Sequence, residues 1–104
     1  MEHEVVINAI NAFYKGAGVR KTFKGPVNEE VAKIFGTMLS ETKKCSTALE
    51  WVPSPPRGKA TVSWIVKLFR KVVIKKLKNS ESLTCVKAVI YKWGRKLDRA
   101  AILG

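Results

Sequence analysis

The chain has 104 residues, 46% of them apolar, and carries 20 Lys and Arg against eight Asp and Glu, a formal net charge of +12. This length supplies one hydrophobic core, so we expect a single domain over residues 1–104. Three Trp and four Phe argue against disorder, because disordered chains combine high net charge with low hydrophobicity. A folded basic domain attracts polyanions, and the two large classes are nucleic acids and acidic membrane surfaces.

The cysteines and the N-terminus give information about the cellular compartment of the protein. Cys45 and Cys85 lie 40 residues apart, with no CxxC motif and no neighbouring His, so they match neither a zinc site nor a disulfide-rich scaffold. We therefore expect reduced, partly buried thiols in an intracellular protein. No apolar run approaches the ~20 residues of a membrane span, and an N-terminus containing Glu2 and Glu4 is unlike a basic signal peptide.

Apolar periodicity predicts helices in the first half of the chain. The first should cover residues 4–16, where one stripe holds Val6, Ile10, Phe13 and Tyr14 and glycines follow. Gly25-Pro26 then indicates a loop. The second helix should cover residues 28–44, because Asn28 can cap it and acidic residues occupy its first turn, at the positive end of the helix dipole.

A proline-rich connector, Trp51-Val52-Pro53-Ser54-Pro55-Pro56, follows the second helix. Three prolines in four residues exclude a regular helix or central strand there. We expect an ordered turn whose Leu49, Trp51 and Val52 tuck into the core, in preference to a ligand for an SH3 domain.

Two further helices are predicted after the connector. The helix expected at residues 60–79 has an apolar arc and a basic side, and Trp64 lies among the basic residues. The last helix is expected at residues 81–100, since Ser80-Glu81 resembles a helix start and an apolar stripe follows. The fold class is therefore all-α, a compact bundle of four to five helices.

The positive charge is concentrated in residues 51–104, which carry 13 basic and two acidic side chains. Two basic groups, one after the first helix and one on the third, could form one lipid- or phosphate-binding surface if they pack side by side. Trp64 would be its membrane-contacting aromatic residue. The expected binding residues are Lys15, Arg20, Lys21, Lys24, Lys67, Arg70, Lys71, Lys75 and Lys78.

Catalytic chemistry has little support in the sequence. The only histidine, His3, lies near a terminus that is expected to fray, and no HExxH motif, EF-hand loop or phosphate-binding loop occurs. We expect no enzyme activity, no catalytic residues, no metal and no cofactor.

The order of elements resembles the matrix domain of retroviral Gag polyproteins, in particular the alpharetroviral and betaretroviral kinds. The resemblance rests on a Gly-Val-basic segment at Gly16–Lys21, an apolar second helix, Trp51-Val52-Pro53, an early Trp64 in the third helix, and Tyr91 and Trp93 in the last. It implies a compact helical domain that brings a structural polyprotein to the inner plasma membrane during assembly of the virion. The positions that match the family's basic residues are Lys15, Arg20, Lys21 and Lys24.

One departure from that family concerns lipidation. Many of its matrix domains carry a myristoyl group on a glycine after the initiator Met, but Glu2 occupies this position here, so binding would have to rely more on charge. Expected partners are anionic membrane phospholipids, RNA or DNA, and further copies of the chain within a larger polyprotein. The alternative function is a nucleic-acid-binding viral or phage regulator, and a third is an adaptor that binds a partner through its proline-rich connector.

Overall fold

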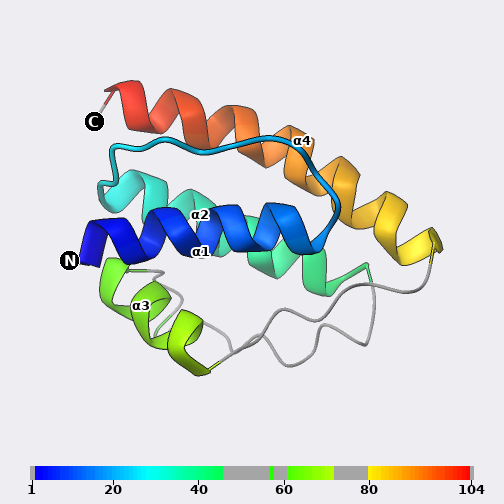
Figure 1. Ribbon diagram of the computed structural model, residues 1–104, viewed down its shortest axis with the longest axis horizontal. Coiled ribbons are helices and arrows are strands. Elements are labelled where there is room, and N and C mark those ends of the chain that lie inside the picture. The colour runs from blue at the N-terminus through cyan, green and yellow to red at the C-terminus, as the bar shows by residue number, and fades with distance from the viewer. Residues whose placement is uncertain (1, 46–56, 58–60, 72–79, 104) are drawn as a thin grey trace.

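The computed structural model describes residues 2–45, 57, 61–71 and 80–103, and it describes their side chains except those of residues 2, 68–71, 80 and 103. Most of these residues lie in four α-helices, and none lies in a strand (Figure 1). The all-α prediction is therefore confirmed for the described part of the chain. The helices are α1 (Glu2–Gly16), α2 (Glu29–Lys43), α3 (Val62–Lys71) and α4 (Ser80–Leu103).

The observed helix bounds differ modestly from the expected ones. Residues 28 and 44 cap α2 and do not belong to it, and α4 is longer than the expected 81–100. The helix expected at 60–79 is α3 within the described residues, whereas 72–79 lie outside them. The proline-rich connector, for which we predict that Leu49, Trp51 and Val52 lie in the core, is also outside the described residues.

Helix α1 ends where its glycines permit it. Gly18 has a φ of +72°, a left-handed conformation that glycine adopts without a steric penalty. The Val19 N–H donates to the Tyr14 carbonyl at 2.9 Å, and the Gly18 N–H donates to the Lys15 carbonyl at 3.0 Å. These two hydrogen bonds form a Schellman motif, which satisfies carbonyls that the helix itself leaves free.

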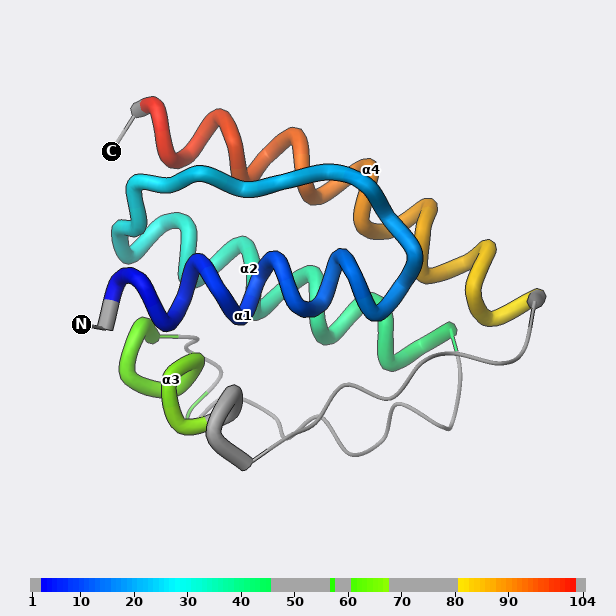
Figure 2. Tube along the Cα trace, in the orientation of Figure 1, coloured from blue at the N-terminus to red at the C-terminus, as the bar shows by residue number. Residues whose placement is uncertain are grey.

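The segment from residue 17 to 28 runs between α1 and α4 without regular secondary structure (Figure 2). Asn11 of α1 holds it through two hydrogen bonds to the Phe23 backbone, at 2.8 and 3.0 Å, and the Phe23 ring is buried. At its end Asn28 accepts a hydrogen bond from the Val31 N–H and donates one to the Ala100 carbonyl. Asn28 therefore caps α2, as the sequence predicts, and also ties the segment to α4.

The four helices bury one apolar cluster. Helix α4 packs mainly against α2, and α3 packs mainly against α1. Phe13 of α1 and Phe35 of α2 meet edge to face, with ring centres 6.1 Å apart. Helices α3 and α4 therefore lie on opposite sides of the α1–α2 pair (Figure 1).

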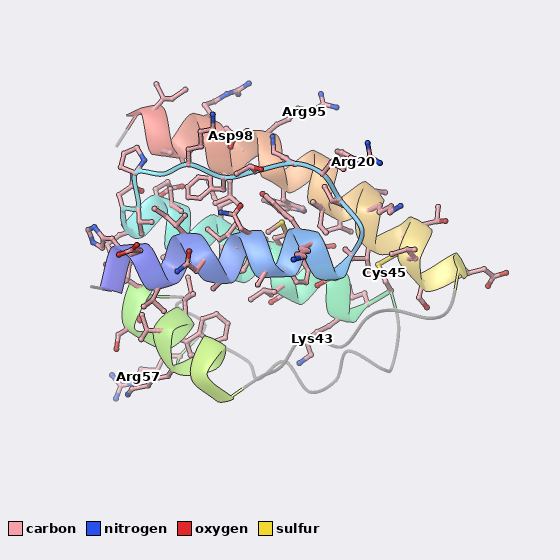
Figure 3. The ribbon with its side chains drawn as sticks, viewed as in Figure 1. Arg20, Lys43, Cys45, Arg57, Arg95 and Asp98 are labelled. Atoms are coloured by element: carbon pink, nitrogen blue, oxygen red, sulfur yellow. A yellow bond between two sulfur atoms is a disulfide. The ribbon has the colours of Figure 1, made fainter. Side chains whose placement is uncertain are left out.

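The structure corrects the expected state of the cysteines. Cys45, just after α2, and Cys85, in the second turn of α4, form a disulfide with a Cα–Cα distance of 5.7 Å (Figure 3). The expectation of free thiols was wrong, because packing of α4 along α2 brings two residues together that are 40 positions apart in sequence.

Candidate polyanion-binding surface

Helix α4 has a buried side and an outward side. Its buried residues recur every three or four positions, as one stripe of an amphipathic helix: Val86, Ile90, Leu97, Ala100 and Ala101. The opposite side is exposed, because α2 and the segment 17–28 cover only the buried and flanking positions.

Four cations occupy this outward side of α4. Lys92, Arg95, Lys96 and Arg99 are all exposed and follow the spacing i, i+3, i+4, i+7, which places them on one helix face. We call these four residues the cationic arc. They span about 10 Å along the helix axis, roughly one Debye length at physiological salt, so their fields reinforce one another.

No acidic side chain balances the cationic arc from within α4. The sequence contains no Asp or Glu between positions 82 and 97. The next acid, Asp98, is paired with Lys21 of the segment 17–28, with 2.6 Å between Lys21 Nζ and Asp98 Oδ2. A bound anion would therefore meet positive potential along this face.

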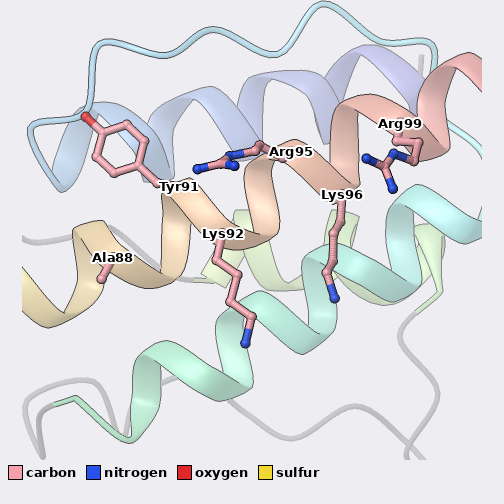
Figure 4. Close-up of a pocket in the computed structure, with 6 residues that line it drawn as sticks. All are labelled: Ala88, Tyr91, Lys92, Arg95, Lys96 and Arg99. Atoms are coloured by element: carbon pink, nitrogen blue, oxygen red, sulfur yellow. The ribbon is translucent and has the colours of Figure 1, made fainter.

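The arc borders an open depression of about 390 Å³, lined by Ala88, Tyr91 and the four cations (Figure 4). Lys92 and Lys96 extend toward α2, whereas Tyr91 and Arg95 lie along the other side of α4. The ammonium groups of Lys92 and Lys96 lie 5.6 and 4.4 Å from the centre of the half-buried Trp93 ring. These cation–π contacts hold both lysines near the depression.

The structure separates the binding residues that the sequence grouped together. Arg20 and Lys24 are exposed on the segment 17–28, near α4, while the exposed Lys67 lies on α3, on the far side of α1. Figure 3 shows Arg20 and Arg95 on the same edge of the molecule. For Arg20 and Lys24 against Lys67, the expectation of one surface was therefore wrong, because α1 lies between them. For the other basic residues expected on the third helix it stays a prediction, because their side chains are not described.

Other expected binding residues have different surroundings. Lys15 is exposed at the end of α1, whereas Lys21 is engaged by Asp98. Arg70 and Lys71 belong to α3, but their side chains are outside the described ones, and Lys75 and Lys78 lie outside the described residues.

Trp64 does not lie on an exposed basic face. It is only 8% exposed and belongs to the core, together with its neighbour Ile65. At about 100° per residue, Trp64 lies closer to Lys67 than to Ile65 around α3, so its burial does not follow from the apolar arc of that helix and comes from packing against other parts of the chain. The expected membrane-contacting position of Trp64 was wrong.

The cationic arc was not among the binding residues expected from the sequence, although the sequence contains a signal for it. Lys92, Arg95, Lys96 and Arg99 have the helical spacing i, i+3, i+4, i+7, as the apolar stripe of the same helix does, and residues 82–97 contain no acid.

Comparison of the chain with protein-family models, with curated proteins and with solved structures finds no match. Among the described helices, none combines the length and apolarity needed to cross a bilayer.

Proposed function

We propose that this chain is a non-enzymatic domain that docks on membranes rich in acidic phospholipids, through the cationic arc of α4. The observation that carries the proposal is the set of four exposed cations on one helix face, with no acidic side chain between positions 82 and 97 and with Asp98 engaged by Lys21. Each Lys or Arg held near an anionic leaflet contributes about 1 kcal/mol of attraction.

A bilayer is favoured over nucleic acid by the aromatic residue beside the arc. Tyr91 lines the same depression as the cations and is 51% exposed. Tyrosine concentrates at membrane interfaces, where its ring meets the acyl boundary and its hydroxyl remains among headgroups. Binding of RNA or DNA phosphates through the same cations is the competing outcome of the test.

The resemblance to retroviral Gag matrix domains gives this proposal a narrower form. In that form the domain would target a polyprotein to the inner plasma membrane during particle assembly. The layout of helices and of Trp51-Val52-Pro53 supports it. The Cys45–Cys85 disulfide weighs against an inner-leaflet location, because disulfides are rare in reducing compartments. Docking on acidic lipid by the arc does not depend on this narrower form.

The test is co-sedimentation with vesicles of phosphatidylcholine alone or mixed with phosphatidylserine. We expect binding only to the mixed vesicles, and we expect it to weaken as salt screens the charges. The double substitution Arg95→Gln and Arg99→Gln should weaken binding roughly thirtyfold at low salt, since it removes about 2 kcal/mol of attraction.

A matched pair on the other side of the molecule controls this experiment. Lys67→Gln with Lys71→Gln removes two cations of α3 at the same i, i+4 spacing, and we expect it to change vesicle binding much less. Loss of binding by the α3 pair alone would return the site to the helix that the sequence suggested. Binding to short RNA or DNA, with no binding to anionic vesicles, would refute the membrane proposal and indicate that the ligand is nucleic acid.

A further inference from the structure

Two large apolar side chains are exposed among the described residues, and both belong to α4. Tyr91 is 51% exposed and Ile102 is 83% exposed. They are 11 residues apart, which is about three helical turns, so they fall on nearly the same line of the helix surface. Arg95 and Arg99 of the cationic arc lie between them along the chain, as does Asp98, whose carboxylate is paired with Lys21.

We propose that Tyr91 and Ile102 are interfacial anchors that seat α4 lengthwise on an acidic bilayer, with the helix axis along the membrane plane. This inference rests on the proposed function and adds the orientation of the domain and the residues that enter the lipid. The occupant of the surface is a phospholipid bilayer, because the surface joins positive charge to exposed apolar groups and so matches the anionic headgroups and the acyl chains beneath them.

The spacing of the anchors determines this orientation. At about 1.5 Å per residue, Tyr91 and Ile102 are roughly 16 Å apart along the axis. Two anchors on one line reach the same depth only when that line lies parallel to the membrane. The guanidinium groups of Arg95 and Arg99 then sit at headgroup level between them.

The arrangement of the helices permits such contact. Helix α4 forms one side of the molecule, and α3 lies on the opposite side of the α1–α2 pair (Figure 1). The small Ala88 continues the exposed face one turn before Tyr91 without adding charge. Arg20, on the same edge as Arg95, adds positive charge beside the helix (Figure 3).

The first experiment uses the salt concentration to distinguish apolar anchoring from electrostatic attraction. The double substitution Tyr91→Gln and Ile102→Gln keeps the charge and the helix propensity but removes the apolar groups. We expect it to bind vesicles containing phosphatidylserine roughly tenfold more weakly than the wild type, both at low salt and at about 0.5 M NaCl, because the burial of apolar groups is not screened by salt. The loss caused by Arg95→Gln with Arg99→Gln should instead shrink at about 0.5 M NaCl, where charges are screened to about 4 Å or less.

Ser63→Gln, an exposed substitution on α3, is the control and should bind as the wild type does. If the wild type fails to bind anionic vesicles even at low salt, the proposed function fails. If the wild type binds and the double variant matches it at both salt concentrations, the anchors are refuted while the function stands.

The second experiment measures the orientation. Amide NMR signals of the wild type bound to phosphatidylserine nanodiscs are recorded with nitroxide-labelled lipid, which attenuates nearby signals. We expect similar attenuation at Tyr91 and at Ile102, with weaker effects on the α3 amides. Attenuation at Ile102 without attenuation at Tyr91 would indicate end-on contact and overturn the lengthwise orientation.

Discussion

Tyr14 and Gly94 show how single residues decide the packing between α1, the segment 17–28 and α4. A Cβ atom at Gly94 would lie 2.9 Å from Lys21 Cε and 3.2 Å from Tyr14 Oη, so a larger residue there would require the Lys21 side chain to shift. A glycine inside a helix costs about 1 kcal/mol relative to alanine. The Lys21 side chain passes close to Gly94 and reaches Asp98.

Tyr14 carries a buried hydroxyl with no hydrogen-bond partner among the described residues. Burial, and secondly the negative charge of Asp98, raise the pKa of this phenol. The folded state therefore holds the proton more tightly than the unfolded chain, in which a tyrosine titrates near pH ~10. The resulting stabilisation is complete below about pH 10 and is lost as the pH rises above that value.

We predict that Tyr14→Phe leaves the free energy of unfolding unchanged or raises it by up to about 1 kcal/mol at neutral pH, because an unpartnered polar atom leaves the core. The variant should also lose stability less steeply than the wild type above pH ~10. Urea unfolding followed by circular dichroism at several pH values measures both effects. Tyr91→Phe, at an exposed tyrosine, is the control; an identical alkaline response in all three proteins would contradict this account of Tyr14.

At the scale of the element, α3 shows why a hydrophobic wheel can misplace a side chain. Trp64 lies three positions before Lys67, so counting by spacing puts it near the basic side, yet its indole is buried and the side chain of Lys67 is exposed. The burial of Trp64 comes from packing against other parts of the chain, which the periodicity of α3 does not encode. Thr61 directly precedes the helix and caps it, because its hydroxyl accepts a hydrogen bond from the Trp64 N–H at 3.1 Å.

We predict that Trp64→Ala lowers the free energy of unfolding by about 3–5 kcal/mol, the usual effect of removing a buried aromatic side chain. Where the variant remains folded, it should bind anionic vesicles as the wild type does. Urea unfolding and vesicle co-sedimentation measure the two properties. A variant that kept its stability but lost vesicle binding would restore Trp64 to the membrane-contacting role expected from the sequence.

At the scale of the whole molecule, the disulfide joins the end of α2 to the beginning of α4. Along the chain, α3 lies between the two cysteines, within the loop that the bond closes. Because the closed loop spans 40 residues, the bond removes many conformations from the unfolded chain.

We predict that reduction of Cys45–Cys85 lowers the free energy of unfolding by about 4 kcal/mol, the loop-entropy value for this spacing. The comparison is urea unfolding of the oxidised protein, with and without a dithiol reductant. Cys45→Ser with Cys85→Ser is the control. Its free energy of unfolding should match that of the reduced wild type and should not change when the reductant is added. An equal unfolding midpoint with and without reductant would show that the bond does not constrain the unfolded state.

Most of the local structure can be predicted from the amino-acid sequence. The glycines after α1, the Asn28 cap and the apolar stripes of α2 and α4 follow from interactions within a few residues, so spacing and residue type suffice to predict them. Lys67 and Arg20 carried the same kind of signal, a cation on an exposed segment, but they lie on different sides of the molecule. Residue type and spacing within one segment do not reveal whether two such cations share a surface or lie on separate surfaces.

Local patterns in the sequence suffice to predict the helices of the described residues, the ends of the first two helices and the excess of positive charge. Contacts between distant segments bring Cys45 to Cys85, bury Trp64 and pair Lys21 with Asp98, the acid nearest in sequence to the cationic arc of α4. The physical reason is that these features are contacts between residues 40 or more positions apart, or cover supplied by another helix. Helix periodicity encodes which side of each helix is apolar, but not which helix covers it.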